Sequence, residues 1–442
     1  MVPRFADYRQ HVAELYAAAL AAADPETAVS AHLHITNSQL RIGQEQHYDL
    51  GRGRVFLVSV GKAAVPMAQA ASRRLGRALH AGIVVAKTLP DTIDLPPVVA
   101  IHTGNHPVPG PNSLAATTAV HDLLQTTTAA DLVLCLISGG ASALLSQPLV
   151  SLADWQALNQ ALLASGCPID AFNTVRRQLD AVKGGGLADW AAPAQVASLI
   201  LSDVVGNPLA IIGSGPTVPG SDTPADALAV LDRYAVAQRL DSAVFRRLQD
   251  ALRQRPSPQT SSSLPPIIVG DVRQAAQAAQ ARAAELGFTA QLLTARLEGE
   301  AREVGRVAAA IAKDLPPQHA FLLGGETTVT LTGSGLGGRN LETALAAAIS
   351  LAGHERVALA SLATDGEDGP TDAAGAIVTG GTAVRAEQAN LSPQAFLANN
   401  DSYHFFHQLD QRTAGTAPPS LLQPGPTGTN VNDLVILLSY GS

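Results

Sequence analysis

The sequence has little cysteine, few aromatic residues and few lysines. Among its 442 residues there are two cysteines, 4% aromatic residues, and four lysines within a total of 29 basic residues. Cys135 and Cys167 are too few for a disulfide framework, so we expect reduced thiols in a cytoplasmic protein. With so few aromatic residues, the cores must be packed mainly with alanine, leucine, valine and isoleucine.

The sequence also lacks a surplus of positive charge and a long apolar run. Its net charge is −8, which excludes the basic field that a nucleic-acid-binding protein presents. Residues 1–25 carry charges throughout and have no continuous apolar core of the kind found in signal peptides. No segment reaches the length and apolarity of a membrane span. We therefore expect small-molecule partners, with no nucleic acid and no membrane.

What the sequence does contain is typical of a buried α/β protein. Hydrophobic residues make up 46% and charged residues 15%. Apolar runs at 55–60, 81–87, 98–102 and 131–138 each precede a glycine or turn-rich segment and a helical pattern. Strands that alternate with helices predict βαβ units and a mostly parallel sheet, whose ligands bind at the carboxyl ends of the strands.

The length of the chain predicts two domains. Residues 254–266 are rich in proline and serine and read as a linker. We expect an N-terminal domain over 1–253 and a C-terminal α/β domain over 267–442. The sequence leaves open on which of the two domains residues 1–50 pack.

Residues 321–340 are the most glycine-rich stretch with a clear pattern. They predict a strand, a turn at Gly325-Glu326, a second short strand and a glycine loop that ends at Arg339. A helix follows. Glycines let a backbone approach a ligand closely, a helix start offers N–H groups, and an arginine adds a fixed positive charge. This combination predicts an anion site, most often a site for phosphate.

The glycines at 333–338 match the G-x-G-x-x-G pattern of dinucleotide-binding proteins. That fingerprint also needs an acidic residue about 20 positions further on, at the end of the next strand. Glu355 lies before that strand and Asp365 well after it, so the match is poor. No Walker A pattern surrounds Lys62 or Lys183, so a nucleotide must be bound by another design.

Two further strand ends carry candidate groups for phosphate chemistry. Lys62 follows a strand and a glycine, where its ammonium could neutralise a transferring phosphoryl group. The alternative is a solvated lysine at a helix start. Ser138–Leu145 forms a second glycine turn that could bind phosphate or the carboxylate of a hydroxyacid. Its alternative is a simple turn between strand and helix.

Acidic residues gather after a later strand. Asp365, Glu367, Asp368 and Asp372 lie in one loop, and oxygen ligands of this kind suit Mg²⁺ bound to phosphates. The alternative is a solvated acidic turn. Asp203 closes another strand and is a candidate for a general base or a metal ligand. The predicted metal ligands are therefore Asp365 and Asp203.

Several segments together resemble the type II glycerate 2-kinases, the family with a MOFRL C-terminal domain. The segments that carry the resemblance are VGKAA, TGNHPVPG, LISGGASALL, NTVRRQLDAVKGGGLA, LSDVVGNPLAIIGSGPTV, GGETTVTLTGSGLGGRN, ATDGEDGPTDAAGA, NNDSYHFF and GPTGTNVNDLVILL. They run from about residue 55 to the C-terminus in the family's order. The functional lysine of the family falls on Lys62 and its functional arginine on Arg339.

The resemblance implies ATP-dependent phosphorylation of D-glycerate at its 2-hydroxyl, with Mg²⁺, to give 2-phosphoglycerate. It also implies an N-terminal Rossmann-like α/β/α domain, a smaller C-terminal α/β domain and an active site in the cleft between them. We expect a monomer or a homodimer. The expected catalytic residues are Lys62, Arg339 and Asp203. The expected substrate- and phosphate-binding residues are Ser138, Gly139, Gly140, Ser142, Gly325, Glu326, Gly335, Gly337, Gly338 and Asn340.

Two alternative functions remain. The first is an NAD(P)H-dependent hydroxypyruvate reductase, a label given to some family members; the poor dinucleotide fingerprint argues against it. The second is a sensor that binds a sugar acid or a nucleotide without turnover. In a sensor, the paired Lys62 and Arg339 would have no catalytic task.

Overall fold

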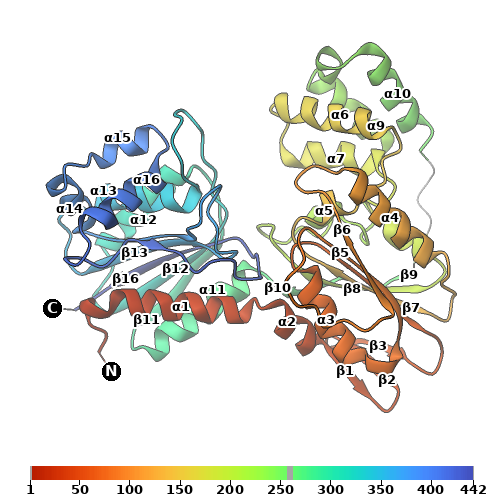
Figure 1. The fold of residues 1–442 in the computed structure, drawn as a ribbon, viewed down its shortest axis with the longest axis horizontal. Helices are drawn as coiled ribbons and strands as arrows, with labels where there is room; N and C mark the ends of the chain where they lie inside the picture. The colour runs from red at the N-terminus through yellow and green to blue at the C-terminus, as the bar shows by residue number, and fades with distance from the viewer. Residues whose placement is uncertain (1, 256–261, 442) are drawn as a thin grey trace. The chain divides into compact units, whose positions relative to one another are not determined.

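The structure is a computed structural model that describes residues 2–255 and 262–441. It divides into two compact units (Figure 1). The N-terminal unit is Pro25–Val269, and the C-terminal unit combines Gly270–Ser442 with Met1–Asp24. Each unit has its own sheet and its own hydrophobic core. The expectation of two dissimilar α/β domains is confirmed.

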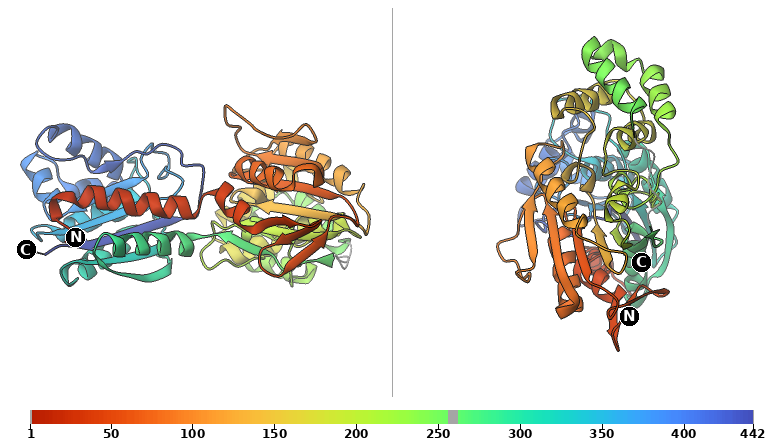
Figure 2. Two further views of the ribbon diagram at one scale, coloured as in Figure 1. Left: turned by 90° about the horizontal axis from the view of Figure 1, so that it is seen from below. Right: turned by 90° about the vertical axis from the view of Figure 1, so that its right-hand side faces the viewer.

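Residues 1–24, whose packing the sequence left open, belong to the C-terminal unit, so the N-terminal unit does not cover the whole of 1–253. The helix α1 (Tyr8–Ala22) lies against α11 (Val272–Glu285), and Figure 2 shows the two side by side. The buried face of α1 carries Val12, Leu15 and Ala19. This face needs a partner, and the alanine-rich α11 supplies one. Residues 1–24 therefore join the C-terminal unit because the apolar face of α1 is buried there, against a helix that is distant in the sequence.

The expected linker at 254–266 does not lie between the two units. Its residues 256–261 fall outside the described part of the chain. After them, β9 (Ser262–Ser263) and β10 (Ile267–Gly270) both join the sheet of the N-terminal unit. The change of unit therefore occurs at the end of β10, with Val269 in one unit and Gly270 in the other.

The main sheet of the N-terminal unit has seven strands in the order β10-β8-β7-β4-β5-β6, and β9 pairs with β8. The central strands β4, β7 and β8 are buried runs of apolar residues, as expected for parallel strands that are covered on both faces. These strands and their neighbours span β4 (Val55–Val60), β5 (Leu79–Ala86), β6 (Val99–Thr103), β7 (Leu132–Ile137) and β8 (Gln195–Leu201). A separate antiparallel sheet contains β1 (Leu33–Thr36), β2 (Gln39–Ile42) and β3 (Gln46–Asp49).

The helices of the N-terminal unit serve two cores. One core lies at the sheet and the other lies between helices around the buried Trp155. The helices near the sheet are α2 (Pro25–His32), α3 (Ala64–Leu75), α4 (Pro111–Leu124), α5 (Ala141–Leu144) and α8 (Gly186–Ala191). The helices of the second core are α6 (Leu152–Ala164), α7 (Ile169–Leu179), α9 (Pro224–Arg233) and α10 (Ser242–Arg253).

The sheet of the C-terminal unit is mixed. Its order is β11-β12-β16-β13-β14-β15, in which only β11 and β12 pair in parallel. The strands are β11 (Thr289–Leu297), β12 (His319–Gly325), β13 (Val357–Ala363), β14 (Gly375–Thr379), β15 (Leu421–Leu422) and β16 (Asp433–Ser439). The remaining helices are α12 (Ala301–Lys313), α13 (Arg339–Leu351), α14 (Thr382–Gln388), α15 (Pro393–Ala398) and α16 (Ser402–Arg412).

The helix α13 is the centre of this unit and is buried along most of its length. Its alanines allow α12 and the sheet to approach closely, so a core poor in aromatic residues can still be dense. Because α13 begins at Arg339, the core fixes the position of this arginine. No described helix is both long and apolar enough to cross a bilayer.

The prediction of a second short strand after Gly325 is wrong. In the described structure this segment forms only a single bridge, between Glu300 and Thr328. The alternating pattern of residues 327–331 resembles a strand, but the backbone N–H of Thr330 donates to the carboxylate of Glu300 at 3.0 Å. The N–H of Thr332 donates to Asn400 Oδ1 at 2.8 Å. Side chains thus satisfy the backbone where a neighbouring strand was expected.

Candidate active site

In the N-terminal unit, two predicted loops are joined at the carboxyl ends of β4 and β7. The N–H of Lys62 donates to the carbonyl of Gly139 at 2.8 Å, and the N–H of Ala63 donates to Ser138 Oγ at 3.1 Å. Gly61 has a φ of 129°, and a Cβ there would lie 2.1 Å from Ser138 Oγ. Only glycine allows this approach, so Gly61 places Lys62 beside the Ser138–Gly140 turn.

Basic groups surround Gly140. A Cβ on this residue would lie 3.5 Å from Lys62 Cγ and 3.1 Å from the ring of His106. Burial lowers the pKa of His106, and the charges of Lys62 and Lys87 lower it further. His106 is therefore held neutral among cations. The turn and the exposed Lys62 thus form a surface suited to an anion.

Asp203 lies on the other side of the same turn. It follows β8, and its Oδ2 would be 2.1 Å from a Cβ placed on Gly139. Gly139 is therefore required for the carboxylate to lie where it does. The structure thus brings together Lys62, Ser138, Gly139, Gly140 and Asp203 at the carboxyl ends of three parallel strands. The N–H groups of Gly139 and Gly140 have no acceptor among the described residues.

Ser142 belongs to a polar network that the sequence did not predict. Its Oγ lies 2.9 Å from Ser214 Oγ, and Arg176 Nη2 donates to both Ser142 Oγ and the Ser142 carbonyl. Ser214 Oγ donates to Asn173 Oδ1 at 3.2 Å. Asn173 and Arg176 belong to the NTVRRQL stretch that carries part of the family resemblance. That stretch was the available signal for these residues.

In the C-terminal unit, Arg339 is held by two acids. Its Nε and Nη2 donate to the two oxygens of the buried Asp433 at 2.5 and 2.9 Å, and its Nη1 lies 3.4 Å from Glu326 Oε1. Burial alone would lower the pKa of Arg339, but Asp433 and Glu326 raise it. Asp433 was missed by sequence reasoning because it is 94 residues away in the chain. Asp433 opens β16, where it lies opposite Gly325 of β12 and Ala363 of β13, at the ends of these two neighbouring strands.

Much of the glycine loop at 333–338 packs against another segment of the same unit, Asn399–Asp401. A Cβ on Gly335 would lie 2.5 Å from Asp401 Cα. The N–H groups of Gly333, Ser334, Gly335 and Leu336 donate to acceptors of Asn399, Asn400 and Asp401. These N–H groups are therefore used within the protein. Those of Gly337 and Gly338 have no acceptor among the described residues, so they keep the predicted capacity for an anion.

A protein carboxylate occupies the start of α13, where the sequence predicted a bound anion. The N–H groups of Asn340 and Leu341 donate to Asp368 at 3.0 and 2.8 Å. Asn340 also accepts from Ser361 Oγ at 2.7 Å. Burial raises the pKa of Asp368 to about 6, although the hydrogen bonds oppose this. Asp368 therefore acts as an internal cap of the helix, and Asn340 lies in its first turn as one of the capped residues.

The acidic loop does not gather its carboxylates at one point. Asp368 caps α13, Asp372 accepts from Tyr403 at 2.7 Å, and Glu367 is exposed. Asp365 is half-buried and close enough to Asp433 to raise the pKa of that group. Among the described residues no cluster of three potential ligands could hold a metal ion.

Gly325 and Glu326 lie at the end of β12. A Cβ on Gly325 would clash with the carbonyl of Leu297 at 2.1 Å, so this glycine permits close packing against β11. Glu326 is exposed, contacts Arg339 and accepts from Asn432 Nδ2 at 3.0 Å. The structure therefore brings Glu326 into the Arg339 group, whereas Gly325 supports the fold beneath it.

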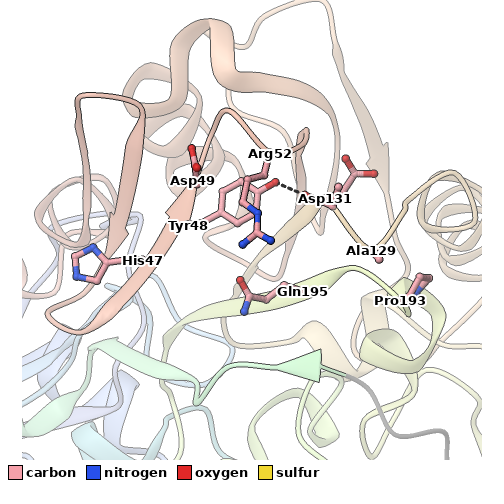
Figure 3. Close-up of a pocket in the computed structure, with 9 residues that line it drawn as sticks. His47, Tyr48, Asp49, Arg52, Ala129, Asp131, Pro193 and Gln195 are labelled. Carbon is pink, nitrogen blue, oxygen red and sulfur yellow. Dashed lines mark hydrogen bonds between the residues drawn. The ribbon is translucent and has the colours of Figure 1, made fainter.

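A cavity of about 540 Å³ lies at the opposite end of the parallel sheet of the N-terminal unit (Figure 3). Tyr48, Arg52, Asp131 and Gln195 are among the residues that line it. Asp131 and Gln195 lie at the amino ends of β7 and β8. None of the predicted site residues lines this cavity. One of its two acids, Asp131, is already paired, since Arg54 Nη2 donates to its carboxylate at 2.7 Å.

Comparison with known proteins identifies the family. Residues 11–249 match a domain of unknown function, DUF4147, and residues 319–433 match the MOFRL family. A Thermotoga maritima protein named D-glycerate 2-kinase is 41% identical over 93% of this chain and 99% of its own length. A relative from Agrobacterium vitis, provisionally named hydroxypyruvate reductase, is 38% identical over 97% of this chain and 94% of its own.

The fold agrees with the sequence match. A crystal structure of a Thermotoga maritima glycerate kinase superposes with a TM-score of 0.85 and 40% identity, covering 98% of this chain and 99% of the other. The resemblance inferred from the motifs is confirmed. This chain belongs to the glycerate kinase family in which a DUF4147 domain is followed by a MOFRL domain.

Proposed function

We propose that the protein phosphorylates D-glycerate at the 2-hydroxyl with ATP, giving 2-phosphoglycerate and ADP. The observation that carries this proposal is the match over nearly the full length of both chains to a protein named D-glycerate 2-kinase. The geometry supports it, because basic groups and unused N–H groups lie at the carboxyl ends of parallel strands. Phosphoryl transfer depends on such groups for positioning and for charge stabilisation.

Lys62 and Arg339 would stabilise the negative charge of the phosphoryl groups. The 2-oxygen of glycerate would form a bond to the γ-phosphorus, and the bond from that phosphorus to the β,γ-bridging oxygen would break. Asp203 would accept the hydroxyl proton. Its position beside Gly139 supports this role. The turn at Ser138, Gly139, Gly140 and Ser142 would bind an anionic group.

The C-terminal unit would contribute Arg339 together with the N–H groups of Gly337 and Gly338. Gly325, Gly335 and Asn340 would act indirectly by shaping the backbone around Arg339. Glu326 would help to orient the guanidinium. In this proposal some residues of the predicted phosphate-binding set would touch a ligand and the others would support them.

Mg²⁺ fits the residues present if the nucleotide brings most of its ligands. Mg²⁺ in kinases keeps several waters and takes one or two carboxylates together with phosphate oxygens. Asp365 and Asp203 are the alternative candidates for such a carboxylate. The ion would neutralise charge on the phosphates when bound.

The reductase alternative rests on the name of the Agrobacterium vitis relative. Two of the three glycines that match a dinucleotide fingerprint, Gly333 and Gly335, pack against Asn399–Asp401, so they leave no room there for the close approach of a pyrophosphate. Release of ADP that depends on D-glycerate is the test. ADP release without NADH or NADPH oxidation on hydroxypyruvate supports the kinase. Nicotinamide oxidation alone would establish the reductase, and ligand binding without either reaction would establish a sensor.

The proposed setting is the cytoplasm, with D-glycerate and ATP as partners and neither nucleic acid nor membrane. The two cysteines, of which Cys135 is buried, are both free thiols, and this supports a reducing compartment. We propose a monomer or a homodimer, which light scattering during size-exclusion chromatography would distinguish.

A further inference from the structure

Two neighbouring arginines on α7 have different electrostatic surroundings. Arg177 is bound by the carboxylate of Asp222. Arg176 forms no ion pair with any carboxylate of the described residues, and its Nε and Nη1 have no acceptor there. A half-buried guanidinium without a carboxylate partner is costly, because burial removes water from a charge. Burial accordingly lowers the pKa of Arg176 to about 10.

The nearest acid cannot neutralise Arg176 because it has another partner. The fully buried Asp180 lies 3.0 Å from Lys183 Nζ. Asp180 also accepts from Ser146 Oγ at 2.6 Å and from the N–H of Gln147 at 3.0 Å. Two cations therefore share one carboxylate. The interior next to the Gly139–Gly140 turn keeps a surplus positive charge.

A directed chain of hydrogen bonds holds Arg176 in place. Because Ser214 Oγ donates its hydrogen to Asn173, it must accept from Ser142, and Ser142 Oγ in turn accepts from Arg176 Nη2. The buried Ser214 has a φ of 63°, an unusual conformation for a residue other than glycine. Strain of this kind is often kept at functional sites. The ring of Phe172 covers the guanidinium, 5.3 Å from Cζ to its centroid.

We infer that Arg176 binds the carboxylate of the 2-hydroxyacid substrate. The guanidinium is fixed on one side by Ser142 and covered by Phe172, and its remaining N–H groups lack a partner. A carboxylate would accept charge-assisted hydrogen bonds from these N–H groups and would supply the missing negative charge. This assignment rests on the proposed function, since it presumes a hydroxyacid as substrate.

Lys183 is a positioning residue in this arrangement. Its Nζ donates to the carbonyls of Ser142 and Leu145 at 2.9 and 3.0 Å. It thereby anchors the backbone to which Arg176 also donates. Because Lys183 holds Asp180, it also keeps that acid from Arg176.

The test compares Arg176→Gln and Arg176→Lys with the unchanged protein, using D-glycerate and its neutral amide as substrates. In Arg176→Gln, the loss of a charged hydrogen bond to the substrate should raise the KM for D-glycerate about 10- to 100-fold. The KM for ATP should not change. Preference for D-glycerate over the amide should fall in Arg176→Gln by a similar factor. A purely structural role would reduce activity on both substrates equally.

The control is Arg247→Lys, which alters an arginine of the same unit bonded to Asp154 at 2.7 Å, away from the site. A rise in the KM for ATP, or an unchanged preference for D-glycerate over the amide, would overturn the assignment. If the unchanged protein makes no 2-phosphoglycerate, the proposed function fails separately. Calorimetric titration of D-glycerate into the unchanged protein and into Arg176→Gln then tests the role of Arg176 separately. Loss of binding in Arg176→Gln supports the assignment, and equal binding in the two proteins refutes it.

Discussion

The two units present opposite balances of charge at the ends of their strands. In the N-terminal unit, Lys62, Arg176 and Lys183 outnumber the nearby acids, and Arg176 has no carboxylate partner among the described residues. In the C-terminal unit, Arg339 lies among Asp433, Glu326 and Asp368. A surplus of cations suits an anionic ligand, whereas an arginine bonded to acids on several sides is fixed in one position. The comparison suggests recognition of substrate charge in one unit and precise placement of one cation in the other.

The units also use glycine differently. Gly139 and Gly140 make room for side chains of Asp203, His106 and Lys62 and leave their own N–H groups unused. Gly333 and Gly335 make room for the backbone of Asn399–Asp401, and their N–H groups donate to Asn400 Oδ1 and to the Asn399 carbonyl. Similar glycine-rich motifs therefore build a ligand surface in one unit and a tightly packed support in the other.

The largest effect should come from Lys62→Ala. Loss of one preorganised group that stabilises transition-state charge costs about 10²- to 10³-fold in kcat. The fold should be unaffected, because the side chain is exposed. Steady-state kinetics with circular dichroism would measure both. Lys313→Ala, which removes an exposed lysine on α12, is the matched control. Activity like that of the unchanged protein in Lys62→Ala would remove its catalytic role.

Asp433→Asn should have the next largest effect. It removes the charge that holds Arg339 through two hydrogen bonds and leaves a half-buried guanidinium without its main partner. Breaking one member of a buried pair costs about 3–5 kcal/mol of stability, and this pair is partly open to solvent, so we expect the lower end. Chemical denaturation would measure the loss. A fall in kcat with the KM for D-glycerate unchanged would show that Asp433 acts through Arg339, whereas unchanged kcat would refute that role.

A pair of glycine substitutions would sharpen the comparison of the two loops. Gly335→Ala would place a methyl group 2.5 Å from a backbone atom, so we expect a stability loss of about 1–3 kcal/mol. Gly139→Ala would meet the movable carboxylate of Asp203, so its main effect should be on kcat. Thermal unfolding and kinetics on both variants would test this. The contrast fails if Gly139→Ala is the less stable of the two.

The smallest effect concerns the pH dependence of stability at Asp368. Burial raises the pKa of Asp368 to about 6, so between pH 4 and 6 the folded protein holds a proton that the unfolded chain releases. The contribution of this group to stability is therefore present at low pH and is lost as pH rises to 6. Asp368→Asn should gain about 1–3 kcal/mol relative to the unchanged protein over that range. A constant difference in denaturant midpoints across those pH values would contradict this expectation.

Local patterns predicted the parts of the site that depend on short stretches of sequence. Lys62 was found because it follows a strand and a glycine, and the Ser138–Gly140 turn because it closes an apolar strand. The parallel sheet then brought these residues and Asp203 together, as the rule for carboxyl strand ends predicts. Arg339 was found from the glycine loop and the helix that follows it.

Residues that depend on distant partners could not be predicted in the same way. Asp433 opens the last strand of the chain, and nothing in its immediate sequence names Arg339 as its partner. Packing of α1 on the C-terminal unit depends on contacts such as Tyr16 with the Ala363 carbonyl, 347 residues apart. The glycine loop looked like a ligand cradle because the sequence does not show that Asn399–Asp401 fills it.

The most direct test of the account is to incubate the protein with D-glycerate, ATP and Mg²⁺ and to identify the product by phosphorus NMR. The account predicts 2-phosphoglycerate together with ADP. Formation of 3-phosphoglycerate would contradict the assignment of the 2-hydroxyl as acceptor. Absence of any phosphorylated glycerate from a folded, metal-supplied protein would contradict the kinase itself.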